Sequence, residues 1–309
     1  MNFIYNIDEL LRAYRSALPP AIGSLISLNG VDGCDGYNPS RAVHYHGRTY
    51  FYVRVEPRGD EFAYWSVPFK EQEQHSWEMD RDLPRLHVQD PFVTRIHGKL
   101  IVGGVSVLAK TDDSVFFETI FLEGESPATL ATFGRGPLNM KDVRLVELSD
   151  GRIGVFTRPL GTKGGRGRIG YTEVESLDDV TPKRMAQAEL LSTQPVEAQW
   201  WGANDAVLLR DGCIGVIGHA AKFNDNNRHY YPIAFVFDPV RRIVVDGPRI
   251  IADRSRFPAY PAKRPDLEDV VFPASFDRQS GTLLCGLSDS AVGTLPIDDP
   301  FTEYERRAT

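Results

Sequence analysis

Residues 90–107 have the sequence DPFVTRIHGKLIVGGVSV, and this stretch decides the fold class of the chain. An Asp precedes a short apolar strand, a glycine marks a turn, and a second apolar strand follows, which is the pattern of a β-hairpin. The same pattern recurs at residues 38–56, 142–159, 204–220 and 269–289, each opened by an Asp or Asn. The hairpin is therefore a repeated unit.

The residues that open the five units are Asn38, Asp90, Asp142, Asn204 and Asp269, and they are spaced by 52 to 65 residues. A period of this size with three or four strands is that of a propeller blade. The sequence thus predicts an all-β fold, a five-bladed β-propeller that forms a single domain over the whole chain. A large β-sandwich with similar hairpins is the alternative.

Composition and charge narrow the functional class. The chain has 309 residues, with 35 Lys and Arg against 42 Asp and Glu, a net charge of −7. An acidic chain is a poor match for nucleic acid or an anionic membrane. Apart from a short predicted helix at Ile7 to Ala17, the pattern is one of strands, and no apolar run approaches the roughly 18 residues of a membrane span.

The N-terminal segment lacks the basic start of a signal peptide, and the three cysteines lie far apart. We therefore expect a cytoplasmic protein without disulfides. A homo-oligomer is compatible with the sequence. His44 and His46 share one strand face but lack a third ligand, so no metal site is predicted.

The residues that open the units carry the candidate chemistry. In a propeller they meet at one mouth of the central channel, so they are expected to converge. Carboxylates and amides bind sugar hydroxyls, and an aromatic ring such as Trp200 or Trp201 packs on the apolar sugar face. Lys141, Arg158 and His219 add positive charge, which suits an anion such as phosphate.

Five segments resemble, in chain order, those of the β-mannoside phosphorylase family, glycoside hydrolase family 130. The match covers about residues 35 to 295. Over this range the sequence resembles an uncharacterised branch of that superfamily more than the proven phosphorylases. The segments with NP, DP, KD, WWG and VVFP motifs lie at residues 37–56, 86–104, 139–159, 200–231 and 268–292.

The resemblance implies a role for each matching residue. Asp90 would be the catalytic acid, which in the family delivers its proton through a sugar hydroxyl, with inversion. Asn38, Arg54 and Asp289 would bind the reacting sugar, and Asp142, Asn204, Trp200 and Trp201 are further substrate-binding candidates. Phosphate would be held by four residues, Lys141, Arg158, His219 and Tyr230.

Three departures from the family pattern keep alternatives open. Gln89 replaces the family Glu, Phe92 replaces the family Arg, and EAQWWGAN lacks the family's further phosphate-binding Lys. Hydrolysis is therefore an alternative to phosphorolysis, with Glu197 or Glu268 as the carboxylate that would activate water.

The resemblance implies an enzyme that cleaves a β-linked, mannoside-like glycoside with inversion, by phosphorolysis or by hydrolysis. It needs no cofactor, and inorganic phosphate is the co-substrate in the case of phosphorolysis. The main alternative is a non-catalytic propeller that binds a sugar or glycan. A propeller that binds proteins has less support, because it need not keep an acid and a basic cluster at the same mouth.

A glycine-rich stretch needs a separate interpretation. Gly165, Gly167 and Gly170 form GxGxxG, but the following YTEVES is predicted to be a strand. The dinucleotide fingerprint requires a helix there, so that function is excluded. We expect this stretch to be a blade loop that lies over an anionic or sugar ligand.

Overall fold

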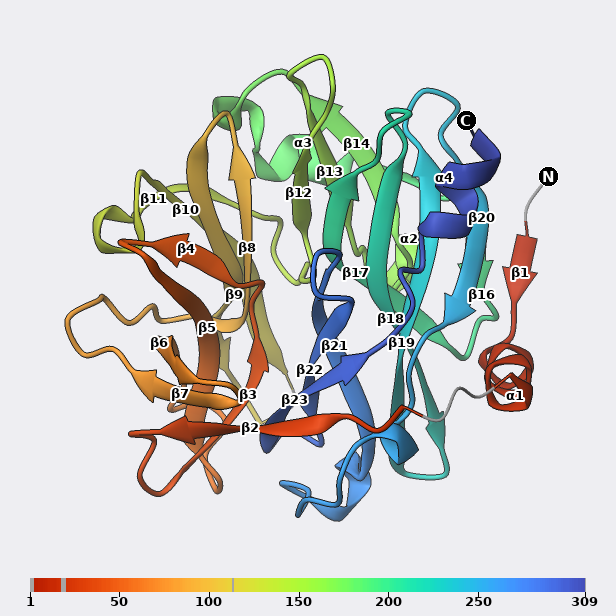
Figure 1. Ribbon diagram of the computed structural model, residues 1–309. Helices are drawn as coiled ribbons and strands as arrows, with labels where there is room; N and C mark the ends of the chain where they lie inside the picture. The colour runs from red at the N-terminus through yellow and green to blue at the C-terminus, as the bar shows by residue number, and fades with distance from the viewer. Residues whose placement is uncertain (1–2, 18–20, 113, 309) are drawn as a thin grey trace.

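The structure is a computed structural model and describes residues 3–17, 21–112 and 114–308. Within these ranges the chain consists mainly of β-strands joined by tight turns (Figure 1). The all-β fold predicted from the hairpin pattern is therefore confirmed.

Hydrogen bonding groups most of the strands into antiparallel units of four. The first unit contains β3 (Cys34–Pro39), β5 (Arg48–Pro57), β6 (Trp65–Glu73) and β7 (Ser76–Met79), with β4 (Val43–Tyr45) paired to β5. The second contains β8 (Gln89–Ile96), β9 (Lys99–Lys110), β10 (Val115–Gly124) and β11 (Ala131–Arg135). The third contains β12 (Arg144–Glu147), β13 (Ile153–Thr157), β14 (Gly170–Val174) and β15 (Glu189–Leu190).

The last two units involve both ends of the chain. The fourth contains β17 (Trp200–Leu208), β18 (Ile214–Asn224), β19 (Asn227–Asp238) and β20 (Ile243–Ile250). The fifth contains β21 (Asp269–Asp277), β22 (Thr282–Leu287), β23 (Ala291–Pro296) and β2 (Ser24–Asn29). Because β2 also pairs in parallel with β7, this strand from the N-terminal part of the chain joins the last unit to the first.

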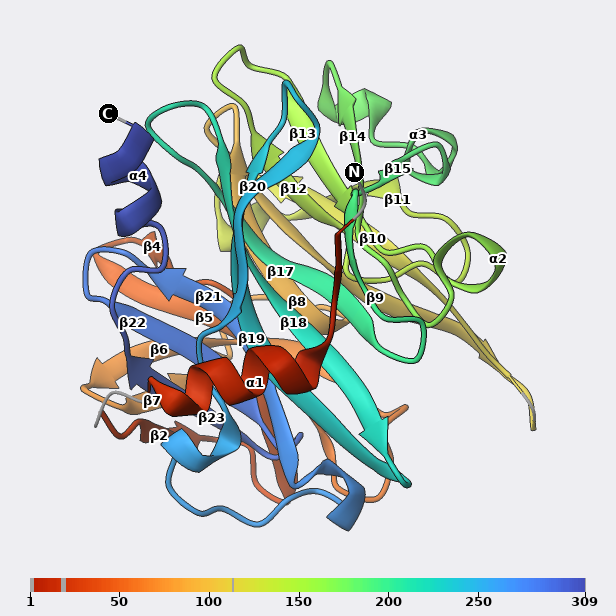
Figure 2. The ribbon, with the colours of Figure 1, turned by 90° about the vertical axis from the view of Figure 1, so that its right-hand side faces the viewer.

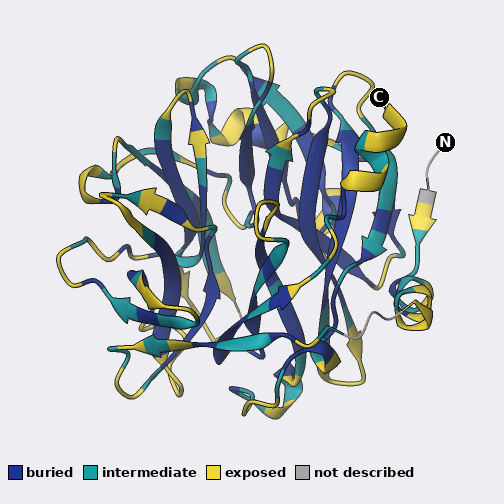
Figure 3. Cartoon of the chain, in the orientation of Figure 1, coloured by how far each residue is buried: buried dark blue, intermediate teal, exposed yellow. Residues whose placement is uncertain are grey.

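The first strands of the units contact one another in sequence. β3 contacts β8, β8 contacts β12, β12 contacts β17, β17 contacts β21, and β21 contacts β3 again. Buried strands gather in the middle of the molecule and exposed turns lie at its periphery (Figure 3). This arrangement places the openings of the first strands next to one another, where the predicted site residues lie.

The glycines at the hairpin turns have the backbone conformation that the turns require. Gly47, Gly98, Gly151, Gly212 and Gly281 all have positive φ, between 66° and 86°. Glycine adopts this conformation without the steric cost that a Cβ atom brings. These glycines in the sequence therefore mark the positions of the hairpin turns.

Helices are few and short in the described ranges. The predicted N-terminal helix is α1 (Ile7–Ser16), whose N-terminus is capped by Asn6, and it packs on β18 and β20 with Ile7 and Leu11 buried (Figure 2). The sequence analysis missed α2 (Gly161–Gly164), α3 (Pro182–Ala186) and α4 (Thr302–Ala308), which are too short to show an apolar period. β1 (Phe3–Tyr5) pairs in parallel with β16 (Thr193–Pro195).

Candidate active site

A cavity of about 510 Å³ lies where the first strands of the units open. It collects predicted site residues from all five units, although these are widely separated in the sequence. The predicted residues that line it are Asn38, Arg54, Asp90, Lys141, Arg158, Trp200, Tyr230 and Asp289.

The backbone at the opening of three units is irregular. Asn38, Asp90 and Asp142 have φ of 47°, 49° and 55°, in the left-handed region. The pairing of β3 with β5 shifts register at Asn38, and the pairing of β8 with β9 shifts register at Asp90, as in a β-bulge. A bulge redirects a side chain, and a left-handed non-glycine residue costs about 1 kcal/mol or more, a pattern common at functional sites.

The candidate acid Asp90 is held from two sides. The Asn38 side chain donates a hydrogen bond to its Oδ1 at 2.8 Å, and an Arg54 nitrogen lies 3.3 Å from the same oxygen. Gly286 makes room for Asn38, because a Cβ atom at position 286 would lie 2.1 Å from the Asn38 Oδ1. Close packing therefore fixes the orientation of the Asp90 carboxylate.

Arg54 is anchored by a buried carboxylate that the sequence analysis did not single out. Glu56 is fully buried, lies 2.8 Å from the Arg54 Nε, and also binds Tyr37 and Lys263. Burial opposes the charge of Arg54, but Tyr37, Asp90 and Glu56 hold its pKa above the ordinary value. Alternation along β5 places positions 54 and 56 on one face, so the sequence carried a signal for Glu56.

Asp289 is a second carboxylate in the cavity. It follows Ser288, and both residues have left-handed φ, 52° and 50°. Burial raises the pKa of Asp289 to about 6, although Arg54 acts in the opposite direction. A carboxyl group with this pKa can gain or lose a proton near neutral pH.

Two basic residues from the third unit face the cavity. A terminal nitrogen of Arg158 lies 2.7 Å from the Asp142 Oδ2. Burial opposes ionisation of Asp142, but positive charge nearby, above all that of Arg158, holds its pKa well below the ordinary value. Burial lowers the pKa of Lys141, which has no ion pair among the described residues. Lys141 is therefore a basic group of the site that no described carboxylate contacts as an ion pair, although Asp142 and Asp90 lie near enough to oppose the lowering of its pKa.

Four predicted site residues do not line the cavity. Asp142, Asn204 and His219 are each at most 3% exposed and form a chain behind Arg158, with the Asn204 Oδ1 2.8 Å from His219 Nδ1. Burial lowers the pKa of His219 to about 3, so its ring is neutral. This placement does not support the predicted direct contacts of these three residues with phosphate or sugar. Trp201 packs in the core near Tyr5.

Three further carboxylates that the sequence analysis named, Asp269, Glu197 and Glu268, also do not line the cavity. Asp269 binds the His229 Nδ1 at 2.6 Å and the Tyr231 hydroxyl at 2.7 Å. The register shift in β21 comes only after Pro273, so Asp269 is not equivalent to Asn38 or Asp90. The candidate water-activating residues Glu197 and Glu268 are exposed and do not line the cavity.

With this geometry in view, the comparisons with known proteins decide the family. Residues 19–303 match the model of DUF1861, described as a protein of unknown function. The chain belongs to the DUF1861 family. No curated protein matches it.

Solved structures resemble this DUF1861 protein over nearly its whole length. A mannose phosphorylase from Leishmania mexicana, MPT-4, solved with phosphate, is 31% identical with a TM-score of 0.89, and the match covers 96% of this chain and 94% of that one. A GDP-Man-dependent mannosyltransferase from the same organism, MPT-1, is 27% identical with a TM-score of 0.86, covering 96% and 95%.

The likeness of the fold extends to glycoside hydrolase family 130. A member described with hydrolases for β-1,2 mannosidic linkages in Candida mannan is 13% identical with a TM-score of 0.56, covering 90% and 95%. The resemblance inferred from the sequence motifs is thus confirmed for this DUF1861 protein. Its structural neighbours include carbohydrate-active phosphorylases and glycosidases.

The cavity of this DUF1861 protein also contains residues that the sequence analysis did not name. Arg166 comes from the loop that contains the GxGxxG motif, as the expectation of a loop over the ligand requires. Gly165 of the same motif also lines the cavity, and the others are aromatic, aliphatic or basic side chains whose positions show no sequence signal: Phe117, Leu160, Phe223, Arg228, Leu267, Val270 and Phe272.

One departure from the family motif has a structural counterpart. Phe92 stands where the family pattern has an Arg, and the guanidinium of Arg144 lies 4.7 Å from the centre of the Phe92 ring. Arg144 is buried and donates to the Asn204 carbonyl at 2.6 Å. A guanidinium from β12 therefore packs against the side chain that replaces the family Arg in β8.

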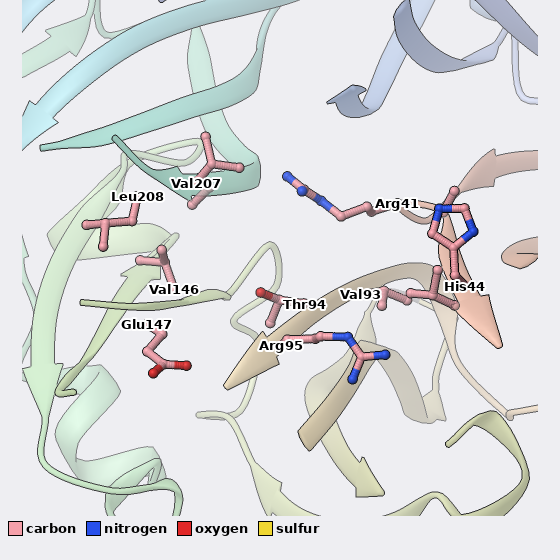
Figure 4. Close-up of a pocket in the computed structure, with 12 residues that line it drawn as sticks. Arg41, His44, Val93, Thr94, Arg95, Val146, Glu147, Val207 and Leu208 are labelled. Atoms are coloured by element: carbon pink, nitrogen blue, oxygen red, sulfur yellow. The ribbon is translucent and has the colours of Figure 1, made fainter. Parts of the chain in front are cut away.

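A second cavity, of about 410 Å³, contains the other ends of the same strands (Figure 4). Arg41, Thr94, Arg95, Glu147 and Val207 are among its lining residues. Its charged groups already have partners in the protein: Arg41 pairs with Asp205, and Glu147 accepts the backbone N–H of His97 at 2.7 Å. The first cavity is therefore the candidate active site.

The described residues contain neither a metal-binding cluster nor a membrane-spanning helix. They contain no group of three or more His, Cys, Asp or Glu side chains that could hold a metal ion. Within the described part of the chain, none of the helices has the length and apolar character needed to cross a membrane.

Proposed function

We propose that this protein is an inverting glycoside phosphorylase that cleaves a β-linked mannoside with inorganic phosphate. We also propose that its five strand units are the blades of a five-bladed propeller, because their first strands contact one another in a closed series. The similarity to MPT-4, a mannose phosphorylase solved with phosphate, supports the substrate class.

One observation carries the choice of phosphorolysis. The cavity is lined by five basic residues and two carboxylates, although the chain as a whole is acidic, and Lys141 in that lining has no ion pair with any described residue. Phosphate satisfies such a group through charge-assisted hydrogen bonds. Neither Glu197 nor Glu268 lines the cavity, and the two carboxylates that do, Asp90 and Asp289, are assigned to proton donation and to binding of the reacting sugar, so phosphate is the proposed nucleophile.

In the proposed reaction Asp90 supplies a proton to the glycosidic oxygen, by way of a sugar hydroxyl as in the related family. The bond between this oxygen and the anomeric carbon breaks, and a phosphate oxygen forms a bond to the same carbon. Attack on the opposite face inverts the configuration, so a β-mannoside yields α-mannose 1-phosphate. The leaving sugar departs with the proton from Asp90.

The other residues bind and orient. Asn38, Arg54 and Asp289 hold the reacting mannose, with Trp200 as an apolar wall. Lys141, Arg158 and Tyr230 hold phosphate. Asp142, Asn204 and His219 act through Arg158: their buried chain fixes the guanidinium rather than touching the substrate.

The test is incubation of the protein with a panel of β-mannosides and β-glucosides, with and without phosphate. Phosphorolysis gives α-mannose 1-phosphate only when phosphate is present, and NMR of the anomeric proton reports the configuration. Free mannose in the absence of phosphate would favour hydrolysis instead. Saturable binding without any product would favour the non-catalytic sugar-binding alternative.

A further inference from the structure

The two basic residues at the lip of the cavity have no role in the proposed phosphorolysis. Arg166 is exposed and comes from the loop after α2, and Arg228 is the second residue of β19. Their guanidinium carbons lie 5.3 Å and 6.0 Å from the centre of the Phe223 ring, whose side chain is 42% exposed. Both basic groups are thus gathered on one aromatic ring at the rim.

The loop that carries Arg166 is fixed to the deeper anion site. A terminal nitrogen of Arg158 donates to the Arg166 carbonyl at 3.2 Å, and the backbone N–H of Trp201 donates to the Gly167 carbonyl at 3.1 Å. Gly167 has φ of 139°, and a Cβ atom there would lie 2.3 Å from the Arg158 Nε. The position of Arg166 is therefore set by the residue that would hold the reacting phosphate.

The pairing of charges divides the basic residues of the cavity into two groups. Arg54 and Arg158 have carboxylate partners, and Arg228 lies 3.3 Å from Asp266. Lys141 inside the cavity and Arg166 at its lip have no ion pair among the described residues. A single inorganic phosphate held at Lys141 would still leave Arg166 without a counter-charge.

We infer that Arg166 and Arg228 form a second anion subsite, which binds a phosphoryl group carried by the substrate itself. This inference rests on the proposed function, in which Lys141 and Arg158 hold the reacting phosphate. Two guanidinium groups at one ring suit a phosphate monoester or diphosphate through forked hydrogen bonds. The preferred sugar at this end is then a phosphorylated one, not a neutral one.

The experiment uses the reverse reaction, with α-mannose 1-phosphate as donor and either mannose or mannose 6-phosphate as acceptor. In that direction an acceptor oxygen bonds to the anomeric carbon, the bond to phosphate breaks, and the acceptor proton passes to Asp90. We expect a kcat/KM about tenfold higher for mannose 6-phosphate than for mannose. Arg166→Gln and Arg228→Gln should each reduce this ratio to near one, because each removes a charged donor.

The matched control is Arg184→Gln, an exposed arginine in α3, which should leave the ratio unchanged. Equal rates for the two acceptors with wild-type protein, or a ratio that survives both lip variants, would overturn the inference. A third reaction uses a nucleoside 5′-diphosphate mannose as the donor. If Arg166→Gln and Arg228→Gln change the rate of this reaction alone, the phosphoryl group that the subsite binds belongs to a nucleotide.

Direct titration keeps the inference testable if no turnover is found. Isothermal calorimetry should detect mannose 6-phosphate in saturating inorganic phosphate, with binding about tenfold weaker in Arg166→Gln and retained in Lys141→Met. Loss of binding in Lys141→Met, or full competition by inorganic phosphate, would show a single anion site and refute the second one. Failure of the phosphorylase proposal alone would leave this binding pattern intact.

Discussion

The two ends of the same inner strands have opposite characters. β8 contributes Asp90 to the candidate active site and Thr94 and Arg95 to the second cavity. At the first end the backbone is left-handed at Asp90, and Lys141 nearby has no counter-charge among the described residues. At the second end Arg41 pairs with Asp205, and Glu147 accepts a backbone N–H. Left-handed backbone also occurs at turn residues such as His97, but Asn38, Asp90 and Asp289 line the first cavity, whereas no described left-handed residue lines the second. This difference favours function at the first end.

The largest expected effect follows from removing the proton of the candidate acid. Asp90→Asn keeps the size of the side chain but cannot donate the proton, so kcat should fall by roughly 10²- to 10⁴-fold. Release of α-mannose 1-phosphate measures the rate, and thermal unfolding checks that the variant is folded. Near-normal turnover in a folded Asp90→Asn protein would assign the acid elsewhere, and Asp289 would then be the next candidate.

The second effect concerns stability and pH at Asp289. Its folded-state pKa is about 6 against an ordinary 3.8, because burial disfavours the charge. Its contribution to stability is therefore complete below about pH 4 and is lost as the pH rises through about 6. Above pH 7 the ionised group costs about 3 kcal/mol. Asp289→Asn should thus be more stable than wild type by about this amount at pH 8.

Urea unfolding of wild type and Asp289→Asn at pH 8 and pH 4 measures this difference. The advantage of the variant should shrink toward zero at pH 4, where wild-type Asp289 is protonated. An advantage of equal size at both pH values would mean that the carboxylate is not disfavoured by burial. A variant less stable at pH 8 would show that its pairing with Arg54 outweighs the cost of burial.

The third effect tests the basic residue without a protein partner. Lys141→Met removes a point charge from the phosphate site, so the KM for phosphate should rise about tenfold. Burial lowers the pKa of Lys141, which means that its charge is disfavoured in the folded protein. The variant should therefore unfold at the same temperature as wild type or a higher one. A lower unfolding temperature with an unchanged KM would make Lys141 a structural residue.

Much of this site could be predicted from the chain, because its signals are local. The Asn or Asp before each apolar pair, the turn glycines and the alternation along β5 all report short-range geometry. The limits of local signals appear at Trp200 and Trp201, which occupy opposite faces of β17. Alternation shows that the two rings diverge, but only the packing of α1 decides that Trp201 is the one in the core.

Other residues could not be predicted because tertiary pairing decides them. Asp269 looks like Asn38 and Asp90 in the sequence, yet the start of β21 pairs in parallel with β19, so its irregularity comes later in the strand. Lys263 reaches Glu56 from a loop distant in sequence, and no motif records that contact. Arg166 reaches the lip only because Arg158 holds its loop.

The smallest effect is expected at the second cavity. Arg95 donates to the Gly98 carbonyl at 3.0 Å from an exposed position, and Glu147 accepts one backbone N–H. Arg95→Gln and Glu147→Gln keep a polar side chain at each position, so unfolding free energies should change by less than about 0.5 kcal/mol. Because the two cavities contain opposite ends of the strands, kcat/KM should stay within about twofold of wild type.

This near-zero result is informative because it is matched to the other end of the same strands. If Arg95→Gln, five residues after Asp90 in the same strand, changed kcat/KM as much as Lys141→Met, the two cavities would act as one substrate path through the molecule. Measured side by side with the same substrate and phosphate concentrations, the pair of variants decides between one functional end and a channel used along its length. The pairing of the charged groups in the second cavity is the reason for expecting the former.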